Sequence, residues 1–498
     1  MKHIDEGRIA DLREQGRRAS RADILAILEK SRALKRLTIA ETAALLAVED
    51  ADLRERLFET ARWVKDAIYG KRVVLFAPLY VSNFCVNQCL YCGFRNDNDD
   101  LPRKALSMEE VAEQTRWLLK RGHMRALLVA GESAPPGMRP IDYLTQCIET
   151  IYATQVGPFR IKRINVNCAP LSVDDFKKLK AAGIGTYQLF QETYHDATYR
   201  AVHVRGPKSD PDRRLDAINQ AFEAGLDDYG VGVLYGLYDY QFETLAMMQH
   251  IEYLETTLGV GPHTISMPRI EPAQGVAYAD NPPAPVSDDD FRKIVAVLRL
   301  AVPYTGLILS TRETPTLRDQ LLDLGISQIS AESATAPGGY GDDEAPELTR
   351  RTQALVALLS GEAPTADPLP VSAVAAASPP PNGAGGQFMT SDQRTLDEVV
   401  LALMEKDYTP SFCAACYRKG RTGEVFMHLA QPGAIKMQCG VNSLATLQEY
   451  LLDFASDEVK TAGKAFIERA MTQIDEPSRR KVEQLFARIA AGERDVYV

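Results

Sequence analysis

The sequence has little of what several classes of protein need. Its 8 cysteines are too few for a disulfide scaffold in a chain of 498 residues. No stretch reaches the roughly 18 consecutive apolar residues of a membrane span, and the charged segment 1–20 has no apolar core of signal-peptide length. The formal net charge of -10 argues against nucleic acid, because phosphates need a concentrated Lys and Arg surface. We therefore expect a cytoplasmic protein with neither a membrane nor a nucleic acid as partner.

What is present is the composition of an ordinary soluble globular protein, with 45% hydrophobic and 25% charged residues. The length exceeds that of a usual single domain. Apolar residues at helical spacing predict an N-terminal helical cap over residues 1–71. Residues 362–387 are rich in Pro, Ala and Gly and predict a flexible linker. Helical periodicity then returns and predicts a mainly helical C-terminal domain over residues 388–498.

Between the cap and the linker, residues 72–345 alternate apolar, β-branched runs with helical segments, which is typical of βα units. Eight units favour a closed α/β barrel of the TIM type, (βα)8, and the alternative is an open doubly wound sheet. Polar residues gather where each run ends, which is the catalytic face of such barrels. The eight expected strands are 72–83, 125–132, 163–170, 186–193, 227–237, 263–270, 306–313 and 328–334.

Six of the cysteines fall into two tight groups, which points to metal. Cys85, Cys89 and Cys92 directly follow the first expected strand and therefore lie in a loop at the top of the barrel. Three thiolates hold three irons of a [4Fe-4S] cubane and leave the fourth iron open for a substrate, whereas an electron-transfer cluster normally has four protein ligands. The alternative is a structural zinc site, although closed zinc sites use four ligands.

This spacing, in the loop after the first strand, resembles the radical S-adenosylmethionine (SAM) superfamily. There the amino-acid end of SAM chelates the open iron, and an electron from the cluster cleaves the sulfonium to a 5′-deoxyadenosyl radical. By position, the resemblance implies SAM contacts for Glu132, for Glu192 and for Arg214, each of which could instead be an ordinary capping or surface charge. Tyr91 is expected to pack beside the cluster. Asn167 alternates with another asparagine along the third strand and faces SAM or substrate, or serves core hydrogen bonding.

The second cysteine group comprises Cys413, Cys416 and Cys439. Two residues separate the first pair and twenty-two the second. Again there are three thiolates without an obvious fourth, so the spacing predicts a second [4Fe-4S] cubane with an open iron. His428 lies inside the loop and would complete a zinc site in the alternative interpretation.

The joint spacing of the six cysteines, with YQLFQETYH, GPKSD, GLYDY, GPHTISMPRIEPA and PGGY, closely resembles the [FeFe]-hydrogenase maturases that lyse tyrosine. The resemblance covers nearly the whole chain. It implies cleavage of the Cα–Cβ bond of L-tyrosine to p-cresol and dehydroglycine at the first cluster. At the second cluster it implies conversion of dehydroglycine to carbon monoxide and cyanide on iron, with an additional iron held through a cysteine ligand. Implied partners are a reducing protein such as a ferredoxin or flavodoxin, and other hydrogenase maturation proteins.

Two further residues are expected to act at opposite mouths of the barrel. Arg312, at the end of the seventh strand, is suited to bind the tyrosine carboxylate, with a structural salt bridge as the alternative. His263 opens the sixth strand, should face the bottom mouth, and resembles the family histidine that holds the extra iron. At about 3.3 Å per residue the two metal sites should lie some 20 Å or more apart, with the C-terminal domain closing the bottom mouth.

Two other functions stay open at this point. One is the tyrosine lyase that makes 2-iminoacetate for thiamine thiazole synthesis, which shares the barrel and the first cluster but lacks the C-terminal domain. The other is a non-catalytic iron-sulfur scaffold, in which Glu132, Glu192 and Arg214 would have no purpose.

Overall fold

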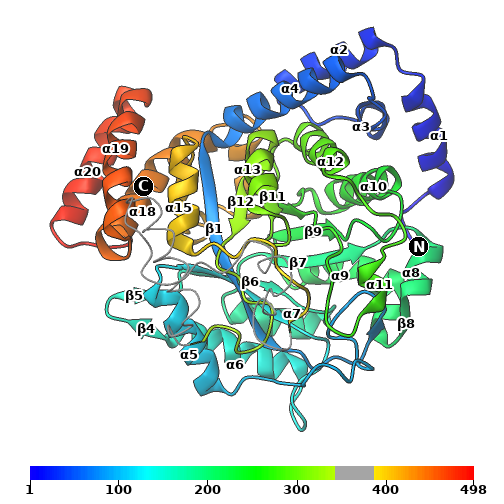
Figure 1. Cartoon of the computed structure of the whole chain (residues 1–498), viewed down its shortest axis with the longest axis horizontal. Coiled ribbons are helices and arrows are strands. Elements are labelled where there is room, and N and C mark those ends of the chain that lie inside the picture. Colours follow the sequence, from blue (N-terminus) through cyan, green and yellow to red (C-terminus); the bar gives the residue numbers. More distant parts are fainter. Residues whose placement is uncertain (342–385) are drawn as a thin grey trace, which may run out of the picture.

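The computed structural model describes residues 1–341 and 386–498, and its centre is a barrel of parallel strands (Figure 1). Each strand is paired with the next, and the last returns to the first through the pairs Val74↔Gln328 and Leu75↔Ile329. This closure confirms the (βα)8 barrel and excludes the open sheet. The eight strands, in chain order and spatial order, are β1 (Arg72–Ser82), β3 (Arg125–Ala130), β6 (Arg163–Asn167), β7 (Tyr187–Glu192), β9 (Tyr229–Val233), β10 (Thr264–Ser266), β11 (Gly306–Leu309) and β12 (Gln328–Ser330).

Helices cover the outside of the barrel, so its strands are buried on both faces and read as continuous apolar runs. The helix after β1 shows how these helices start. Ser107 accepts a hydrogen bond from the backbone N–H of Glu110, and the Glu110 carboxylate accepts one from the N–H of Ser107. The covering helices are α5 (Met108–Lys120), α6 (Pro140–Ala153), α7 (Val173–Ala181), α9 (Pro211–Glu223), α10 (Tyr240–Leu258), α12 (Asp288–Ala301) and α13 (Pro315–Leu324).

Four helices precede the barrel and lie along its upper right edge in Figure 1, coloured blue. Capping boxes at Ser20 and Thr38 begin the second and third of them. The third and fourth pack against α10 and α12, and their apolar faces join the core of that half of the barrel. The helices are α1 (Glu6–Arg17), α2 (Arg21–Arg32), α3 (Ile39–Leu46) and α4 (Ala51–Tyr69).

The C-terminal part is mainly helical and lies at the left of Figure 1, with its last helices in red. Its one strand, β13 (Thr409–Ser411), pairs in parallel with the first residues of β1, in the register Arg72↔Thr409. This part is therefore hydrogen-bonded to the amino end of the barrel, the bottom mouth. Its helices are α15 (Leu396–Glu405), α16 (Ala415–Arg418), α17 (Gly423–Ala430), α18 (Ile435–Asp453), α19 (Asp457–Gln473) and α20 (Glu476–Ala490).

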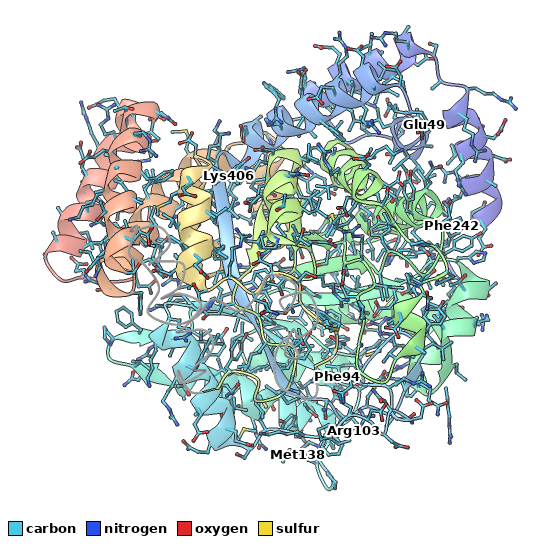
Figure 2. All side chains as sticks on the ribbon, viewed as in Figure 1. Glu49, Phe94, Arg103, Met138, Phe242 and Lys406 are labelled. Carbon is cyan, nitrogen blue, oxygen red and sulfur yellow. The ribbon has the colours of Figure 1, made fainter. Side chains whose placement is uncertain are left out.

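Two short strands lie at the top mouth, where β2 (Gln88–Cys89) forms an antiparallel pair with β8 (His203–Arg205). The two mouths lie at opposite ends of the molecule in Figure 2, where Phe94 and Arg103 of the loop after β1 are low and Lys406 is high. No helix in the described ranges is long and apolar enough to cross a bilayer. The remaining elements are β4 (Gln155–Val156), β5 (Phe159–Arg160), α8 (Asp196–Val202), a 3-10 turn at Pro207–Ser209 and α11 (Ala277–Asp280).

The linker expected at 362–387 falls outside the described residues, except for Gly386 and Gln387. The same holds for the last residues of the barrel segment expected at 72–345. Gln387 does not lie in an exposed linker, because it lines the cavity at the top of the barrel.

Candidate active site

The first cysteine group lies in the loop that follows β1, at the top mouth. Pairing of β2 with β8 sets Cys89 opposite His203 and buries it, while Cys85 and Cys92 are half-buried. Burial raises the pKa of the Cys89 thiol to about 12 and raises that of Cys92 as well. These cysteines therefore become thiolates readily only when a metal is there to stabilise the charge.

Two side-chain amides point their N–H groups at sulfur atoms of this loop. Asn87 Nδ2 lies 3.6 Å from Cys85 Sγ, and Gln387 Nε2 lies 3.6 Å from Cys92 Sγ. Among the described residues no three His, Cys, Asp or Glu side chains converge as ligands of a single ion. A multi-iron cluster, which spaces its cysteines more widely than one zinc ion does, fits this donor set better.

Glu132 follows β3 at the same mouth and is held by two partners. Arg213 Nη1 lies 2.9 Å from Glu132 Oε1, and Asn87 Nδ2 donates to Glu132 Oε2 at 2.7 Å. Gly131 must be glycine because a Cβ there would clash with the carbonyl oxygen of Phe84. The loop is therefore locked against the cysteine loop, with the carboxylate at the cavity wall.

Glu192 is the last residue of β7, where the sequence predicts it, and its backbone is left-handed with φ at +73°. Such a conformation costs a non-glycine residue free energy and is kept where the surroundings impose it. Lys208 Nζ lies 2.7 Å from Glu192 Oε1, and Arg214 Nη2 lies 3.5 Å from the same atom. Arg214 Nε also donates to the carbonyl of Phe190. The expected pair of Glu192 and Arg214 is brought together, with Lys208 as a third member.

Tyr91 and Asn167 both line the cavity beside these carboxylates. The Tyr91 hydroxyl lies 2.7 Å from His203 Nε2, and Lys208 Nζ lies 5.5 Å from the Tyr91 ring. Tyr91 is thus fixed by a buried hydrogen bond next to the cluster loop. Asn167, at the end of β6, faces inward, and Asn165 on the same face lines a second cavity below.

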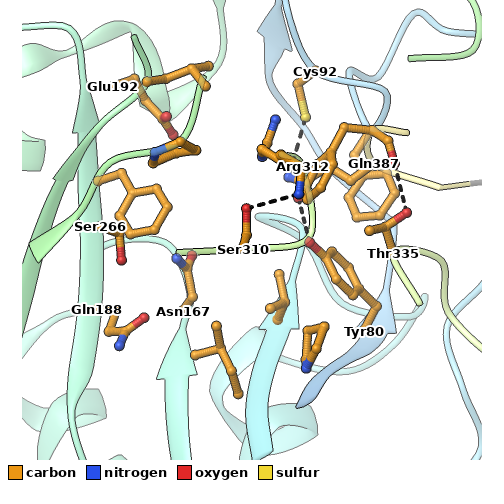
Figure 3. A pocket seen from close by; sticks show the side chains of 18 of the residues that line it. Tyr80, Cys92, Asn167, Gln188, Glu192, Ser266, Ser310, Arg312, Thr335 and Gln387 are labelled. Carbon is orange, nitrogen blue, oxygen red and sulfur yellow. Dashed lines mark hydrogen bonds between the residues drawn. The ribbon is translucent and has the colours of Figure 1, made fainter. Parts of the chain in front are cut away.

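The cavity at the top mouth has about 1560 Å³ of empty space, its open mouth included, and extends from the cysteine loop down to Phe76 and Gln188. Figure 3 shows Arg312 in this space, close to Tyr80 and Gln387. The Arg312 guanidinium stacks on the ring of Phe388 at 3.3 Å from the centroid, and its Nη1 lies 3.3 Å from the Arg269 carbonyl oxygen. No carboxylate in the described ranges forms a salt bridge with Arg312, which leaves charge available to a ligand.

The sequence predicts that Arg312 ends its strand. This prediction is wrong, because β11 stops at Leu309 and Arg312 lies in the loop that follows. The backbone N–H of Arg312 donates to Ser310 Oγ, and this bond turns the chain out of the sheet before Arg312. Burial lowers the pKa of the Arg312 guanidinium, and the neighbouring Tyr80 and Glu271 oppose that change. An anionic ligand would therefore stabilise the charged guanidinium in this environment.

A second, smaller cavity of about 260 Å³ lies between the first one and the bottom mouth. Four residues line both cavities, so the two are neighbours along the barrel axis. The lower one is also lined by Arg125 and Arg163, the first residues of β3 and β6. The shared residues are Phe76, Leu127, Gln188 and Ile308.

The second cysteine group lies at the bottom mouth. Arg125 Nη1 donates to the carbonyl oxygen of Cys413 at 2.7 Å, and the Arg163 guanidinium lies over the ring of Tyr417 at 2.9 Å. The Tyr417 hydroxyl lies 3.0 Å from Thr186 Oγ1. Burial, together with the nearby Cys439, raises the pKa of the Cys416 thiol to about 12. The six residues of β3, at about 3.3 Å each, separate the two groups by roughly 20 Å.

His263 lies at the same mouth, one residue before β10 begins at Thr264. Its ring centroid is 4.2 Å from that of Phe426, and its Nδ1 is 3.3 Å from Asp228 Oδ1. The pair is not aligned for a hydrogen bond. Within the described ranges His263 Nδ1 has no other partner, whereas Asp228 Oδ2 lies 3.7 Å from Arg163 Nη2. Burial lowers the pKa of His263 and keeps it neutral. A neutral, buried imidazole with an unpartnered nitrogen is suited to a metal.

His428, the residue that would complete a zinc site, points to solvent. Its side chain is 73% exposed, and its Nε2 lies 3.3 Å from Glu424 Oε1 on the same helix. The zinc alternative for the second group therefore lacks a fourth ligand in the part of the chain that the structure describes.

Several residues of the top site were not found from the sequence. Their contacts depend on loops that meet only in the fold, and the motif GPKSD, which contains Lys208, was the only signal for any of them. These residues are Asn87, Lys208, Arg213, Gln387 and Phe388.

Comparison with known proteins agrees with this geometry. The family model of the radical SAM superfamily matches residues 79–251, and that of the Biotin and Thiamin Synthesis associated domain matches residues 266–409. A crystal structure of HydG, a maturase of the [FeFe]-hydrogenase, superposes over 100% of both chains with a TM-score of 0.88 and 44% identity. The chain belongs to the HydG family.

Two further relatives define this family relationship. HydG from Carboxydothermus hydrogenoformans is 36% identical over 97% of both chains, with a TM-score of 0.77. The 2-iminoacetate synthase of Salmonella typhimurium is 33% identical, over 64% of this chain and 83% of that protein. The HydG likeness extends through the C-terminal part. The chain is thus a radical SAM enzyme with the fold of the hydrogenase maturases, and its superfamily uses a [4Fe-4S] cluster and SAM.

Proposed function

We propose that the chain is a tyrosine lyase that cleaves the Cα–Cβ bond of L-tyrosine to p-cresol and dehydroglycine, and then forms carbon monoxide and cyanide on iron for the active site of [FeFe]-hydrogenase. One observation carries the proposal. Two groups of three cysteines lie at opposite mouths of a single barrel, and cavities with shared lining residues occupy the space between them. We propose that a small product of the first site passes along this axis to the second.

At the top mouth, Cys85, Cys89 and Cys92 are proposed to hold a [4Fe-4S] cluster. When bound, this cluster would hold SAM at its open iron and supply the electron that cleaves it. The SAM contacts are proposed to include Tyr91 and Asn167 beside three charged side chains. The carboxylates of Glu132 and Glu192 suit the SAM ammonium group, and Arg214 suits its carboxylate.

Arg312 is proposed to bind the carboxylate of tyrosine. Its side chain is half-buried, its planar guanidinium is stacked on Phe388, and no carboxylate in the described ranges forms a salt bridge with it. A bidentate pair there would set the amino acid at a fixed height above the lower cavity. The same contact excludes amines and phenols that lack a carboxylate.

At the bottom mouth, Cys413, Cys416 and Cys439 are proposed to hold a second [4Fe-4S] cluster. His263 is proposed to hold the additional iron, itself joined to the cluster through a cysteine ligand. Its Nδ1 lies 3.3 Å from Asp228 Oδ1 without a hydrogen bond, which supports this assignment. With metal bound, Asp228 would accept a hydrogen bond from Nδ1 and leave Nε2 for the iron, as hydrogen-bond partners of metal-bound histidines do.

We further propose three functional segments, a cap over 1–71, the barrel over 72–345 and the auxiliary-cluster domain over 388–498. The electron for SAM cleavage is proposed to come from a ferredoxin or flavodoxin. The iron product is proposed to pass to other hydrogenase maturation proteins.

The decisive experiment is an anaerobic assay of the reconstituted full chain with SAM, tyrosine and a strong reductant. Both p-cresol and carbon monoxide should form, with carbon monoxide trapped by deoxyhaemoglobin and p-cresol followed by chromatography. No product of either kind with intact clusters would rule the lyase out and leave the scaffold function. Formation of p-cresol alone would favour a 2-iminoacetate synthase, the second candidate, which the likeness to the Salmonella protein supports.

A further inference from the structure

Residues 386–392 run across the top mouth, and we call this segment the strap. It begins with the last two residues of the segment expected to be a linker, yet its backbone is bonded to several barrel loops. Gly93 lies so close beneath it that a Cβ there would come within 2.9 Å of the carbonyl oxygens of Gly386 and Gln387. The backbone bonds are Gly93 N to Gln387 O, Gln387 N to Thr335 O, Met389 N to Pro272 O, and both Ser391 N and Asp392 N to Thr311 O.

The Gln387 side chain is fixed between a phenol and a cluster cysteine. The Tyr80 hydroxyl donates to Gln387 Oε1 at 2.9 Å, and Gln387 Nε2 donates to Cys92 Sγ at 3.6 Å. Because a hydroxyl donor occupies the amide oxygen, the amide nitrogen is the end that faces the sulfur. Figure 3 shows this chain of Tyr80, Gln387 and Cys92 at the wall of the cavity.

An N–H group aimed at a cluster thiolate favours the more negative state of the cluster. Reduction adds an electron, part of whose charge falls on the cysteine sulfurs, so a hydrogen bond to sulfur becomes stronger on reduction. Such bonds are among the factors that set the reduction potentials of iron-sulfur clusters. The effect is largest where water is excluded, and Cys92 lies half-buried beneath the strap, which is bonded to the adjacent Gly93.

We propose that Gln387 is a positioning residue that raises the reduction potential of the first cluster through its hydrogen bond to Cys92. This inference rests on the proposed function, because it takes Cys92 to be a cluster ligand. It gives a role in electron uptake to a residue outside the cysteine motif and outside the eight barrel strands. Electron transfer to SAM then depends on the strap being in place.

The test is an EPR-monitored redox titration of the reconstituted full chain, in which the first cluster is identified as the signal that changes when SAM is added. Gln387→Met keeps the length of the side chain but has no N–H. At a fixed solution potential we expect the ratio of reduced to oxidised first cluster to fall about fivefold to tenfold, where tenfold corresponds to 59 mV. Pulsed EPR in D₂O should also lose the coupling of one exchangeable deuteron near the cluster.

Two control variants separate the hydrogen bond from the strap itself. Gln387→Glu keeps the acceptor for Tyr80 but removes the N–H, so it should shift the potential in the same direction. Thr335→Val removes the hydroxyl that donates to Phe388 O, which anchors the strap without touching sulfur, and should leave the potential unchanged. An equal shift in Thr335→Val would overturn the inference, because the position of the strap would then be the cause.

The two proposals fail in different ways. If a SAM-sensitive cluster forms and its potential is the same in native chain, Gln387→Met and Gln387→Glu, the role of Gln387 is wrong and the proposed function stands. If the native chain forms no SAM-sensitive cluster, the proposed function is wrong, and the inference with it.

Discussion

Arg213 donates to Glu132 with 2.9 Å between Nη1 and Oε1, and this contact joins helix α9 to the loop after β3. It holds in place a carboxylate that we propose to contact SAM. The Arg213 side chain is partly exposed, so solvent screening reduces what the pair contributes. Arg213→Met should raise KM for SAM about fivefold, with kcat nearly unchanged. The matched control is Arg200→Met, since Arg200 is an exposed arginine that pairs with Asp196 away from the cavity. An equal change in both variants would contradict the positioning role.

Substitution of Arg312 should affect tyrosine and not SAM. Arg312→Lys keeps the charge but loses the bidentate fork and the planar stacking on Phe388. We expect kcat/KM for tyrosine, followed as p-cresol formation, to fall roughly 100-fold, which corresponds to about 2.7 kcal/mol. SAM binding, measured by its effect on the EPR signal of the first cluster, should be unchanged. A loss of SAM binding would move Arg312 out of the tyrosine site.

Removal of the second cysteine group should separate the two reactions. In a Cys413→Ala/Cys416→Ala variant, roughly half of the bound iron should be lost, because one of the two proposed cubanes keeps only Cys439 as a ligand. Formation of p-cresol should continue while carbon monoxide disappears. Concurrent loss of p-cresol, with the first cluster intact by EPR, would show that the two mouths do not act independently.

A bulky residue between the two cavities should block the path along the barrel. Ile308 lines both cavities, and Ile308→Phe adds a ring where the lining is shared. We expect p-cresol to form normally while carbon monoxide falls at least tenfold, and glyoxylate from hydrolysis of dehydroglycine should accumulate in solution. Ile308→Val, which makes the position smaller, is the control and should retain both products. Unchanged carbon monoxide formation in Ile308→Phe would mean that the intermediate takes another route.

Lys65 should make the free energy of unfolding depend on pH. This lysine is fully buried in α4, with its Nζ 3.9 Å from the ring of Tyr408, and burial lowers its pKa to about 7. In the unfolded chain it keeps its proton up to about pH 10.5. The unfolded state therefore binds more protons between pH 7 and 10.5, and the contribution of Lys65 to the free energy of unfolding rises with pH across that range.

Lys65→Met removes this group and should raise the thermal midpoint at pH 7 while flattening its rise toward pH 10.5. The measurement is a series of thermal melts of both chains between pH 6 and 10. Lys293→Met is a suitable control, because Lys293 is paired with Glu49 and burial does not lower its pKa below the usual value. Parallel curves for native chain and Lys65→Met would contradict the prediction.

Most of the barrel could be predicted from the sequence because strands buried on both faces leave long apolar runs. Their ends were less predictable. The run expected to form a strand over 263–270 yields only β10, Thr264–Ser266, because Pro268 has no N–H for the sheet and its carbonyl accepts from Tyr235 instead. Arg312 lies beyond its strand for a similar local reason.

The residues of the candidate site were also only partly predictable from the sequence. Short-range spacing reveals the first group of cysteines, because the three proposed ligands of that cluster lie close in sequence. Asn87, Arg213 and Gln387 are joined to that loop only by tertiary contacts, so no pattern marks them. Glu332 is a further example, because its carboxylate pairs with Arg121 at 2.9 Å and accepts the backbone N–H of Leu396, both distant in the sequence.

Strand β1 is the strand at which the barrel closes, because it pairs with both β3 and β12. It also pairs with β13 of the C-terminal part. The polypeptide that carries the second cysteine group therefore supplies backbone hydrogen bonds to the strand on which closure depends. Arg318, buried under β12, also depends on Asp392 from the segment just before α15 as its anionic partner. A chain shortened before residue 386 would keep all eight βα strands but lose both supports. Residues 386–498 thus stabilise the closed form of the barrel in addition to carrying the second cysteine group.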